Sequence, residues 1–496
     1  MASEASSIST GKAAVARRSS TAATAATGTS HAVPVESRLA HAAVAVTVLL
    51  AAALVWLAAG HAYLAPPARF SYPGWMSGPL APLSHFYHAS GLAMRTEFTA
   101  VVVGMFACYL IVVSRAAQLR TRWLLAAIVA AHLVFFLSPP LSLTDVFNYI
   151  NYGRMEIMHG LNPYVTAPVL EPHSDPSFTI SNWHHLLSPY GPLFTIFTFA
   201  FVPLGVAASF WVLKGVLLLA SLATLWLIWR CAELLGHEPR RAVAFVGLNP
   251  LILVWGLGGD HNDFLLILCV MLAVYLLLRA AAAGPASTES HLSALAFGAG
   301  VALAAAIAIK ASAAILLPVV LLGATRRLRL LAGVVLGALV FAGASLAAFG
   351  VHLPNLSDQS RLVTALAIPN VLGFAFGSGG ETDALKTAMS VVLLVSVGAC
   401  ALWAARSRNW ITACGFATLA LIATLSWTLP WYVLWLLPFA ALARSRALSA
   451  ATTALCIYTV IAWVPLGADL RRVTGLEPAT TKLGRLHQAW AKALLH

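Results

Sequence analysis

The sequence predicts an all-α polytopic membrane protein, and three observations support this prediction. The chain has 496 residues, of which 60% are hydrophobic and only 9% are charged, whereas soluble domains carry about 45–50% apolar and about 25% charged residues. The apolar residues gather in runs of about 17–25, the length that crosses a bilayer once as a helix. Lysine and arginine gather in short segments between alternate runs, as they do on the cytoplasmic side of membrane proteins. A water-soluble globular protein and a largely disordered chain are both excluded.

The apolar runs predict a bundle of about 13 transmembrane helices with a large outer loop. In chain order the runs cover about 42–60, 97–114, 122–138, 208–230, 240–257, 263–281, 293–309, 311–323, 330–349, 384–405, 409–427, 431–443 and 447–466. Residues 1–37 are rich in Ser, Thr and Ala, and we expect a disordered cytoplasmic tail there. The membrane domain is expected over 38–466, with the outer loop and its juxtamembrane helices at 139–207, and a C-terminal tail over 467–496.

The basic residues predict which side of the membrane each loop occupies. With the N-terminal tail inside, the arginine groups that also fall inside are 115–122, 230–241, 326–329, 406–408 and 444–446. This agreement requires the apolar segment 191–206, which has prolines at both ends, to lie along the outer surface without crossing. The segments SPYGPL (188–193) and GGDHND (258–263) then share the outer side, and so does the C-terminal tail.

Charge, cysteine content and motifs exclude several other functions. The net charge of +13 is explained by orientation in the membrane, so no nucleic-acid partner is expected. The six cysteines lie in or beside apolar runs and are typical of small buried residues. The sequence contains no dinucleotide or nucleoside-triphosphate loop and no serine-hydrolase or zinc-protease motif. No cofactor is therefore expected, although carboxylates and histidines on the outer side leave a divalent metal possible.

The long outer loop contains the first candidate catalytic residue, Asp145, which directly follows an apolar run. Asp145, Tyr149, Tyr152 and Glu156 recur at a spacing of three and four, which places them on one face of a helix. Asp145 could cap that helix at its N-terminus, or it could be catalytic at the membrane surface. The spacing leaves both interpretations open.

A second polar group, GGDHND, lies between two apolar runs on the same predicted side. Its Asp260, His261 and Asp263 are costly at a bilayer edge unless they are paired or functional. A hydrated turn that caps the next helix is the alternative.

Several isolated residues also suggest chemistry within the membrane. Lys310 interrupts an alanine-rich run and is either functional or extended toward the interface, and Lys214 has the same ambiguity. His132 is interpreted as a buried structural histidine. Trp431 and Tyr432 could bind a sugar ring, although such residues normally anchor helices at the membrane surface.

An ordered series of motifs resembles the polyprenyl-phosphate-mannose-dependent mannosyltransferases of actinobacteria, which belong to the glycosyltransferase C superfamily. The series is PPLSLTDVFNYINYGRMEIMHGLNPY at 139–164, SPYGPL at 188–193, NPL with GGDHND at 249–263, K-x-S-A with LP at 310–318 and PWYVLWLLP at 430–438. The resemblance covers roughly 139–440 and implies the fold of that superfamily.

The resemblance implies an inverting transfer of a hexose, mannose in that family, from a polyprenyl-phosphate sugar to a glycan or glycolipid acceptor. Asp145 matches the family's general base. The cations expected around the donor phosphate are Lys310, Arg361, Arg154 and His261. The residues expected around the sugar and acceptor are Tyr149, Asp260, Asp263, Trp431 and Tyr432. The protein would then lie in the plasma membrane, among its lipids, with the site facing outside.

Two other classes remain open from the sequence, a secondary transporter and a non-catalytic lipid-binding assembly subunit. A transporter would place its charged residues at the bilayer midplane between structural repeats. A transferase would bring Asp145, GGDHND and Lys310 around one outward cavity.

Overall fold

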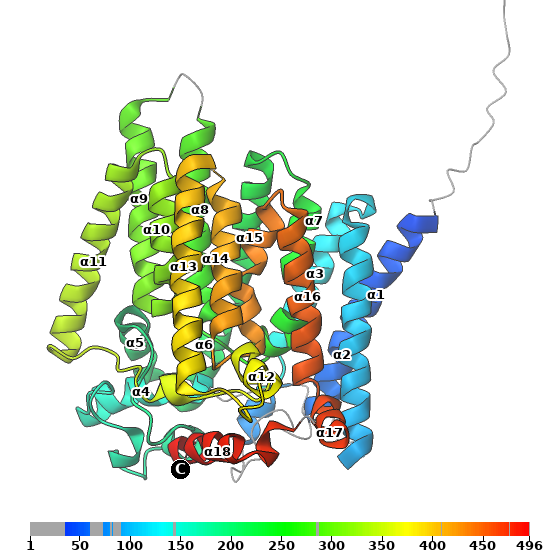
Figure 1. The fold of residues 1–496 in the computed structure, drawn as a ribbon, viewed down its shortest axis with the longest axis vertical. Coiled ribbons are helices and arrows are strands. Elements are labelled where there is room, and N and C mark those ends of the chain that lie inside the picture. The colour runs from blue at the N-terminus through cyan, green and yellow to red at the C-terminus, as the bar shows by residue number, and fades with distance from the viewer. Residues whose placement is uncertain are drawn as a thin grey trace, which may run out of the picture.

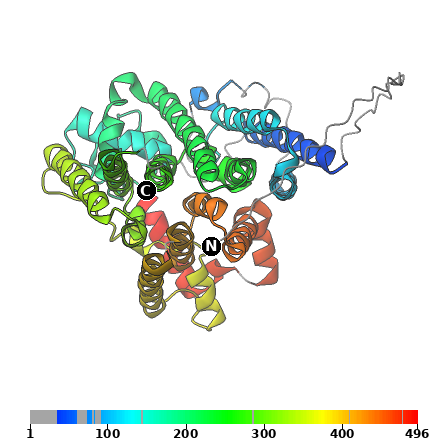
Figure 2. The same cartoon turned by 90° about the horizontal axis from the view of Figure 1, so that it is seen from above.

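The protein is a helical bundle, seen here in a computed structural model that describes residues 35–59, 73–79, 82, 91–141, 145–283, 287–407, 409–475 and 477–495. Every regular element in these ranges is a helix, which confirms the predicted all-α class. The long helices run side by side (Figure 1), and α1 to α3 stand on the opposite side of the bundle from α11 (Figure 2). Most of the predicted N-terminal tail, 1–34, lies outside the described residues.

Each predicted apolar run coincides with helix in the structure. The helices are α1 (Val35–Ala59), α2 (Gly91–Ser114), α3 (Thr121–Phe136), α6 (Gly205–Leu234), α7 (Pro239–Gly247), α8 (Asp263–Ala282), α9 (Glu289–Ile309), α10 (Leu316–Gly323), α11 (Arg327–Phe349), α13 (Asp383–Ser407), α14 (Trp410–Thr424), α15 (Leu437–Leu442) and α16 (Arg446–Trp463). In the described residues 8 helices are long and apolar enough to cross a membrane, or 9 with the bent pair α7 and Leu251–Leu257. Four further apolar helices are shorter, so the count of 13 crossings stays a prediction.

Most of the short helices lie at one end of the bundle, which we call the loop end. They are α4 (Asp145–His159), α5 (Pro192–Phe199), α12 (Ile368–Ala375), α17 (Pro465–Thr474) and α18 (Lys482–Leu495). Figure 1 shows them around the lower ends of the long helices, together with the C-terminus. The C-terminal tail is therefore at the same end as the predicted outer loop.

The segment 191–206 contains no helix long enough to cross a bilayer by itself. Its helix α5 has 8 residues, which at about 1.5 Å per residue is far shorter than a bilayer. Together with α6 the segment forms one continuous apolar stretch, Pro192–Leu234. Gly205, where α6 begins, has a positive φ of 77°. SPYGPL and GGDHND both lie at the loop end, and it stays a prediction that this end faces the outside.

A close backbone contact fixes the position of Lys310. The Gly191 amide donates to the Ile309 carbonyl at 3.0 Å, and a Cβ on Gly191 would lie 2.1 Å from the Ala308 oxygen. Only glycine permits this approach. Helix α9 ends there, and Lys310 continues in extended conformation (φ −155°, ψ 123°) before a 3₁₀ turn at Ala311–Ile315. The lysine therefore interrupts the helix and does not extend along its side.

The segment GGDHND follows an irregular stretch of backbone. Residues Leu251–Leu257 form a π-helix, a conformation that is frequent at functional sites, and Asp260 has a positive φ of 55°. The Leu141 amide donates to the Gly258 carbonyl at 2.6 Å. This bond ties the start of the outer loop to the turn that carries Asp260, His261 and Asp263.

The single crossing between 191 and 234 predicts that His185 and Glu233 face opposite sides of the membrane, since both side chains are exposed and lie at opposite ends of this stretch. After replacement of the six native cysteines, His185→Cys and Glu233→Cys should react with an impermeant thiol reagent from opposite sides of sealed vesicles. Reaction of both from the same side would show that 191–206 crosses.

Candidate active site

A cavity of about 390 Å³ opens at the loop end of the bundle. Among the residues predicted from the sequence, Asp145, Lys310, Trp431 and Tyr432 line it. Its walls come from α4, 183–190, 310–312, 356–362, α13 and 421–435. Four of the five predicted motifs, which are distant in sequence, therefore meet around one space, whereas no residue of 249–263 lines it.

Asp145 is the first residue of α4 and lines the cavity beside a buried imidazole. Its Oδ2 lies 3.5 Å from Nδ1 of His261. His261 is buried and stacks on the Trp431 ring at a centroid distance of 3.4 Å. Neither ring nitrogen of His261 has a hydrogen-bond partner among the described residues. His261 thus lies directly behind the cavity wall, next to the Asp145 carboxylate.

Lys310 forms a buried ion pair with Asp263 at the cavity wall. Its Nζ donates to the two carboxylate oxygens of Asp263 at 2.9 and 3.1 Å. The Trp435 indole donates to the same carboxylate at 2.6 Å, and the ammonium lies over the rings of Tyr432 and Trp435 at 5.1 and 5.2 Å. Asp263 is 1% exposed, so the predicted acceptor ligand is instead the counter-ion of Lys310.

Asp260 belongs to a separate, fully buried pair. Its Oδ2 lies 3.6 Å from Nζ of Lys214, whose ammonium also donates to the Ser138 carbonyl at 2.6 Å. Neither Lys214 nor Asp260 lines the cavity. In the part of the chain that the structure describes, no three His, Cys, Asp or Glu side chains could hold a metal ion. The structure places Asp260 in the packing of the bundle.

Tyr149 is buried beneath the cavity wall and does not line the cavity, although it shares a face of α4 with Asp145. Its hydroxyl accepts from the Asn262 amide at 3.3 Å, and its ring packs edge-on against Tyr190 and Phe194. Tyr149 therefore joins α4 to the start of α8, and the structure does not bring it to the predicted sugar platform.

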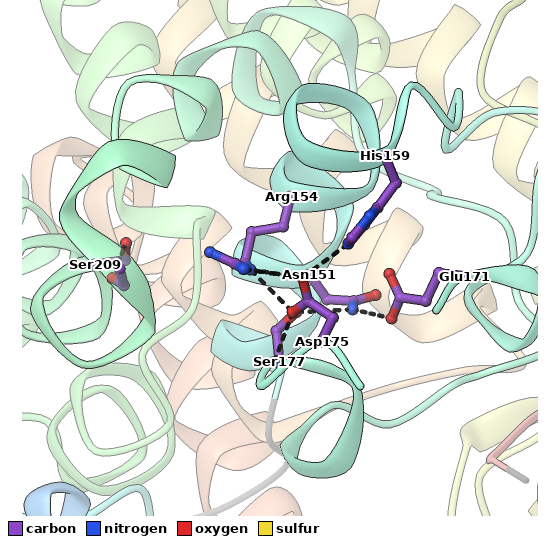
Figure 3. Close-up of polar contacts among 8 residues, drawn as sticks. Asn151, Arg154, His159, Glu171, Asp175, Ser177 and Ser209 are labelled. Carbon is purple, nitrogen blue, oxygen red and sulfur yellow. Dashed lines mark hydrogen bonds and ion pairs between the residues drawn. The ribbon is translucent and has the colours of Figure 1, made fainter. Parts of the chain in front are cut away.

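Arg154 is also absent from the cavity and forms an ion pair within the outer loop (Figure 3). Its Nε and Nη2 donate to the carboxylate of Asp175, both at 2.9 Å. Nε2 of His159 lies 2.8 Å from the same carboxylate. These contacts attach the second half of α4 to the loop at 172–178, which makes Arg154 a positioning residue in this structure.

Two carboxyl groups of this outer-loop cluster have opposite electrostatic environments. Burial raises the pKa of Glu171 to about 7, although the Asn151 amide donates to it at 2.5 Å. Burial alone would raise the pKa of Asp175 as well, but hydrogen bonds from Arg154 and Ser177 hold it well below its usual range. Asp175 is thus the charged partner in the cluster, whereas Glu171 can be protonated near neutral pH.

Arg361 lies just outside the cavity wall. Its guanidinium is 5.1 Å from the ring centroid of Trp490 in α18, while its neighbours Ser360 and Leu362 line the cavity. Arg361 itself does not line the cavity, so the structure does not place it where a phosphate in the cavity would be expected.

Several lining residues were not among the predicted site residues. They include Asn148, Trp183, Tyr190, Lys386, Trp427 and Trp435. Trp435 belongs to the PWYVLWLLP motif that singled out Trp431, so the motif could have indicated it. Lys386 lies near the start of an apolar run, where a lysine is typical of any membrane helix, and nothing in the sequence set it apart.

Comparisons with known proteins match most of the chain to one family. Residues 49–326 match the family model described as "Alpha-(1->6)-mannopyranosyltransferase, N-terminal domain", and residues 363–480 match the model described as "MptB C-terminal domain". A protein of Mycobacterium tuberculosis named alpha-(1->6)-mannopyranosyltransferase A is 27% identical over 364 residues, 67% of each chain. A Corynebacterium glutamicum protein of the same name is 26% identical over 348 residues, 60% of this chain and 66% of the relative. No solved structure matches the chain.

The raised pKa of Glu171 predicts a pH dependence of stability. An unfolded glutamate titrates near about 4.3, whereas burial places the folded pKa at about 7. The contribution of Glu171 to stability is therefore complete below about pH 4 and is lost as the pH rises to about 7. Asp175, with its lowered pKa, loses its contribution only as the pH falls below its unfolded value.

The measurement is thermal unfolding of wild type and Glu171→Gln in detergent between pH 4.5 and 8. The melting temperature of wild type should fall relative to that of the variant as the pH rises to about 7, and the difference should then stay constant. Parallel curves throughout the range would contradict the assignment of this titration to Glu171.

Proposed function

The chain belongs to the alpha-(1->6)-mannopyranosyltransferase family, whose N-terminal model matches more than half of it, and we propose that it transfers a mannosyl residue from a polyprenyl-phosphate sugar to a glycan or glycolipid acceptor. The reaction would take place at the outer face of the plasma membrane. The observation that carries the proposal is the meeting of Asp145, Lys310 and Trp431 around one cavity at the loop end. The names of the two relatives support mannose as the sugar.

Asp145 would act as the general base. A sugar hydroxyl is a weak nucleophile, and a carboxylate within hydrogen-bond reach can accept its proton as the oxygen attacks the anomeric carbon. The new bond joins the acceptor oxygen to that carbon while the bond to the phosphate oxygen breaks, with inversion. The proton passes to Asp145, and the electron pair leaves with the polyprenyl phosphate. His261, at 3.5 Å, would hold the carboxylate in place.

The cations and aromatic rings of the cavity would bind the phosphate and the sugar rings of the substrates. The departing phosphate gains negative charge, and Lys310 lines the cavity as a cation fixed by Asp263. Trp431 and Tyr432 offer aromatic surface for sugar rings, in keeping with pockets that combine aromatic walls with a few polar groups. A secondary transporter would place its charges near the midplane between repeats, whereas Asp145, His261 and Lys310 lie together at one end.

Replacement of the proposed base should abolish transfer without unfolding the protein. Asp145→Asn should lower the transfer rate by about 10²–10⁴-fold, while loss of a helix-terminal acid costs only about 1 kcal/mol of stability. Asp383→Asn is the matched control, because Asp383 also begins a helix but is exposed and outside the cavity. Transfer is measured with labelled polyprenyl-phosphate mannose and purified protein in liposomes. Equal rates for Asp145→Asn and Asp383→Asn would refute the general-base role.

A double substitution separates the structural role of Lys310 from its proposed effect on the phosphate. Lys310→Gln leaves the buried Asp263 carboxylate with only the Trp435 indole, which should cost about 3–5 kcal/mol of stability. Lys310→Gln with Asp263→Asn removes both charges and should regain most of that stability. If the ammonium stabilises the leaving phosphate, the double variant should still transfer slowly.

Lys214→Gln is the control for Lys310, since Lys214 has the same ion-pair chemistry but lies outside the cavity. Unfolding and donor-dependent transfer rates are measured for all four proteins. A stable double variant with the rate and the donor KM of wild type would show that Lys310 only compensates Asp263.

A further inference from the structure

Lys386 is a second cation in the cavity, and its charge is not compensated as that of Lys310 is. It lines the cavity from the second turn of α13, and its ammonium donates to the backbone carbonyl of Ser360. Lys310 is neutralised by Asp263. Among the described residues no carboxylate oxygen lies within the 4 Å ion-pair distance of the Lys386 ammonium.

Lys386 acts electrostatically on the carboxyl group of Glu381, but this carboxyl group is engaged elsewhere. The Ser426 hydroxyl donates to the Glu381 carboxylate at 2.8 Å. Burial raises the pKa of Glu381, and Lys386 only partly offsets this effect. Glu381 is therefore a poor counter-ion, and the positive charge of Lys386 is available to an anion inside the cavity.

Along α13, from Lys386 away from the loop end, the lining of the cavity changes from polar to apolar. Ser390 and Leu393 follow at helical spacing on the same face of α13, and Leu421 of α14 lines the same region. The neighbouring face of α13 is formed by Leu394 and other exposed apolar residues, as expected of a surface against lipid. A lipid that enters the cavity sideways from the bilayer would place its hydrocarbon chain against Leu393. Its head group would lie near Lys386, at the membrane surface.

We propose that Lys386 binds the phosphate of the lipid-linked donor, with the first units of its hydrocarbon chain along Ser390 and Leu393. This inference rests on the proposed function and adds a residue to it. A lone ammonium attracts a phosphate more strongly than a neutral ion pair does, so Lys386 would hold the phosphate, while Lys310, as proposed above, would stabilise the charge that develops on the phosphate oxygen that leaves the sugar. On transfer the phosphodiester becomes a phosphate monoester with one more negative charge, which Lys386 would stabilise as it develops.

The test compares binding of a polyprenyl phosphate and of the uncharged polyprenol to full-length protein in phosphatidylcholine nanodiscs. The wild type should bind the phosphate more tightly than the alcohol. Lys386→Gln should weaken phosphate binding by about 10- to 100-fold and leave alcohol binding unchanged, because it removes a charged hydrogen-bond donor. Lys386→Arg should keep most of the preference.

Two further variants control for general effects on the protein. Lys482→Gln removes an exposed lysine of α18 at the same end of the bundle, and it should behave as wild type does. Leu393→Phe narrows the apolar part of the cavity, so it should weaken phosphate and alcohol alike. Melting temperatures of all variants are measured in the same nanodiscs.

The outcomes distinguish this inference from the proposed function. If wild type transfers mannose but Lys386→Gln retains the full preference for the phosphate, Lys386 is not the phosphate ligand. If the effect of Lys386→Gln appears only when the nanodiscs contain phosphatidylglycerol, the lysine binds bilayer head groups, and the inference is overturned. If wild type shows neither transfer nor preference for the phosphate, the proposed function fails and this inference fails with it.

Discussion

The ion pair between Lys310 and Asp263 joins distant segments of the chain at the wall of the cavity. Burying a charge is unfavourable unless a partner and hydrogen bonds compensate it, and here the partner comes from a different helix. Lys310 stands where α9 is interrupted, Asp263 begins α8, and the Trp435 indole that completes the set comes from Pro430–Trp435. Three segments far apart in sequence must therefore converge before either charge is satisfied, and the cavity forms where they meet.

The position of Asp145 depends on contacts made further along α4. Tyr149 joins the helix to Asn262 at the base of α8, and Arg154 joins it to Asp175 of the outer loop. These contacts lie on both sides of α4, so the first residue of the helix is fixed although it stands at the edge of an open cavity. A catalytic carboxylate needs such support, since small displacements of reacting groups greatly reduce rates.

The helices could be predicted well from the sequence because one continuous apolar run identifies a membrane helix, as at 293–309 and 447–466. It also placed Asp145 and Lys310 at one end through loop charge and motif order. It could not assign Arg154 or Asp263 correctly, because the partner of each lies 21 and 47 residues away with no periodic signal. Lys386 escaped notice for a related reason: its significance lies in the absence of a nearby carboxylate, and only the folded chain shows which charges are neighbours.

Some segments around the cavity lie within the ranges that match the family models, and one helix behind its wall does not. Asp145, Lys310 and Trp431 lie within the ranges that match the two family models, whereas α18 begins at Lys482, beyond both. Yet Leu494 of α18 packs with Trp183 and Leu362, which line the cavity, and its carbonyl accepts from the His185 amide at 3.1 Å. The match to the family therefore supports the wall that carries Asp145, Lys310 and Trp431. The wall at Trp183 and Leu362 also depends on contacts with α18, which lies outside the matched ranges.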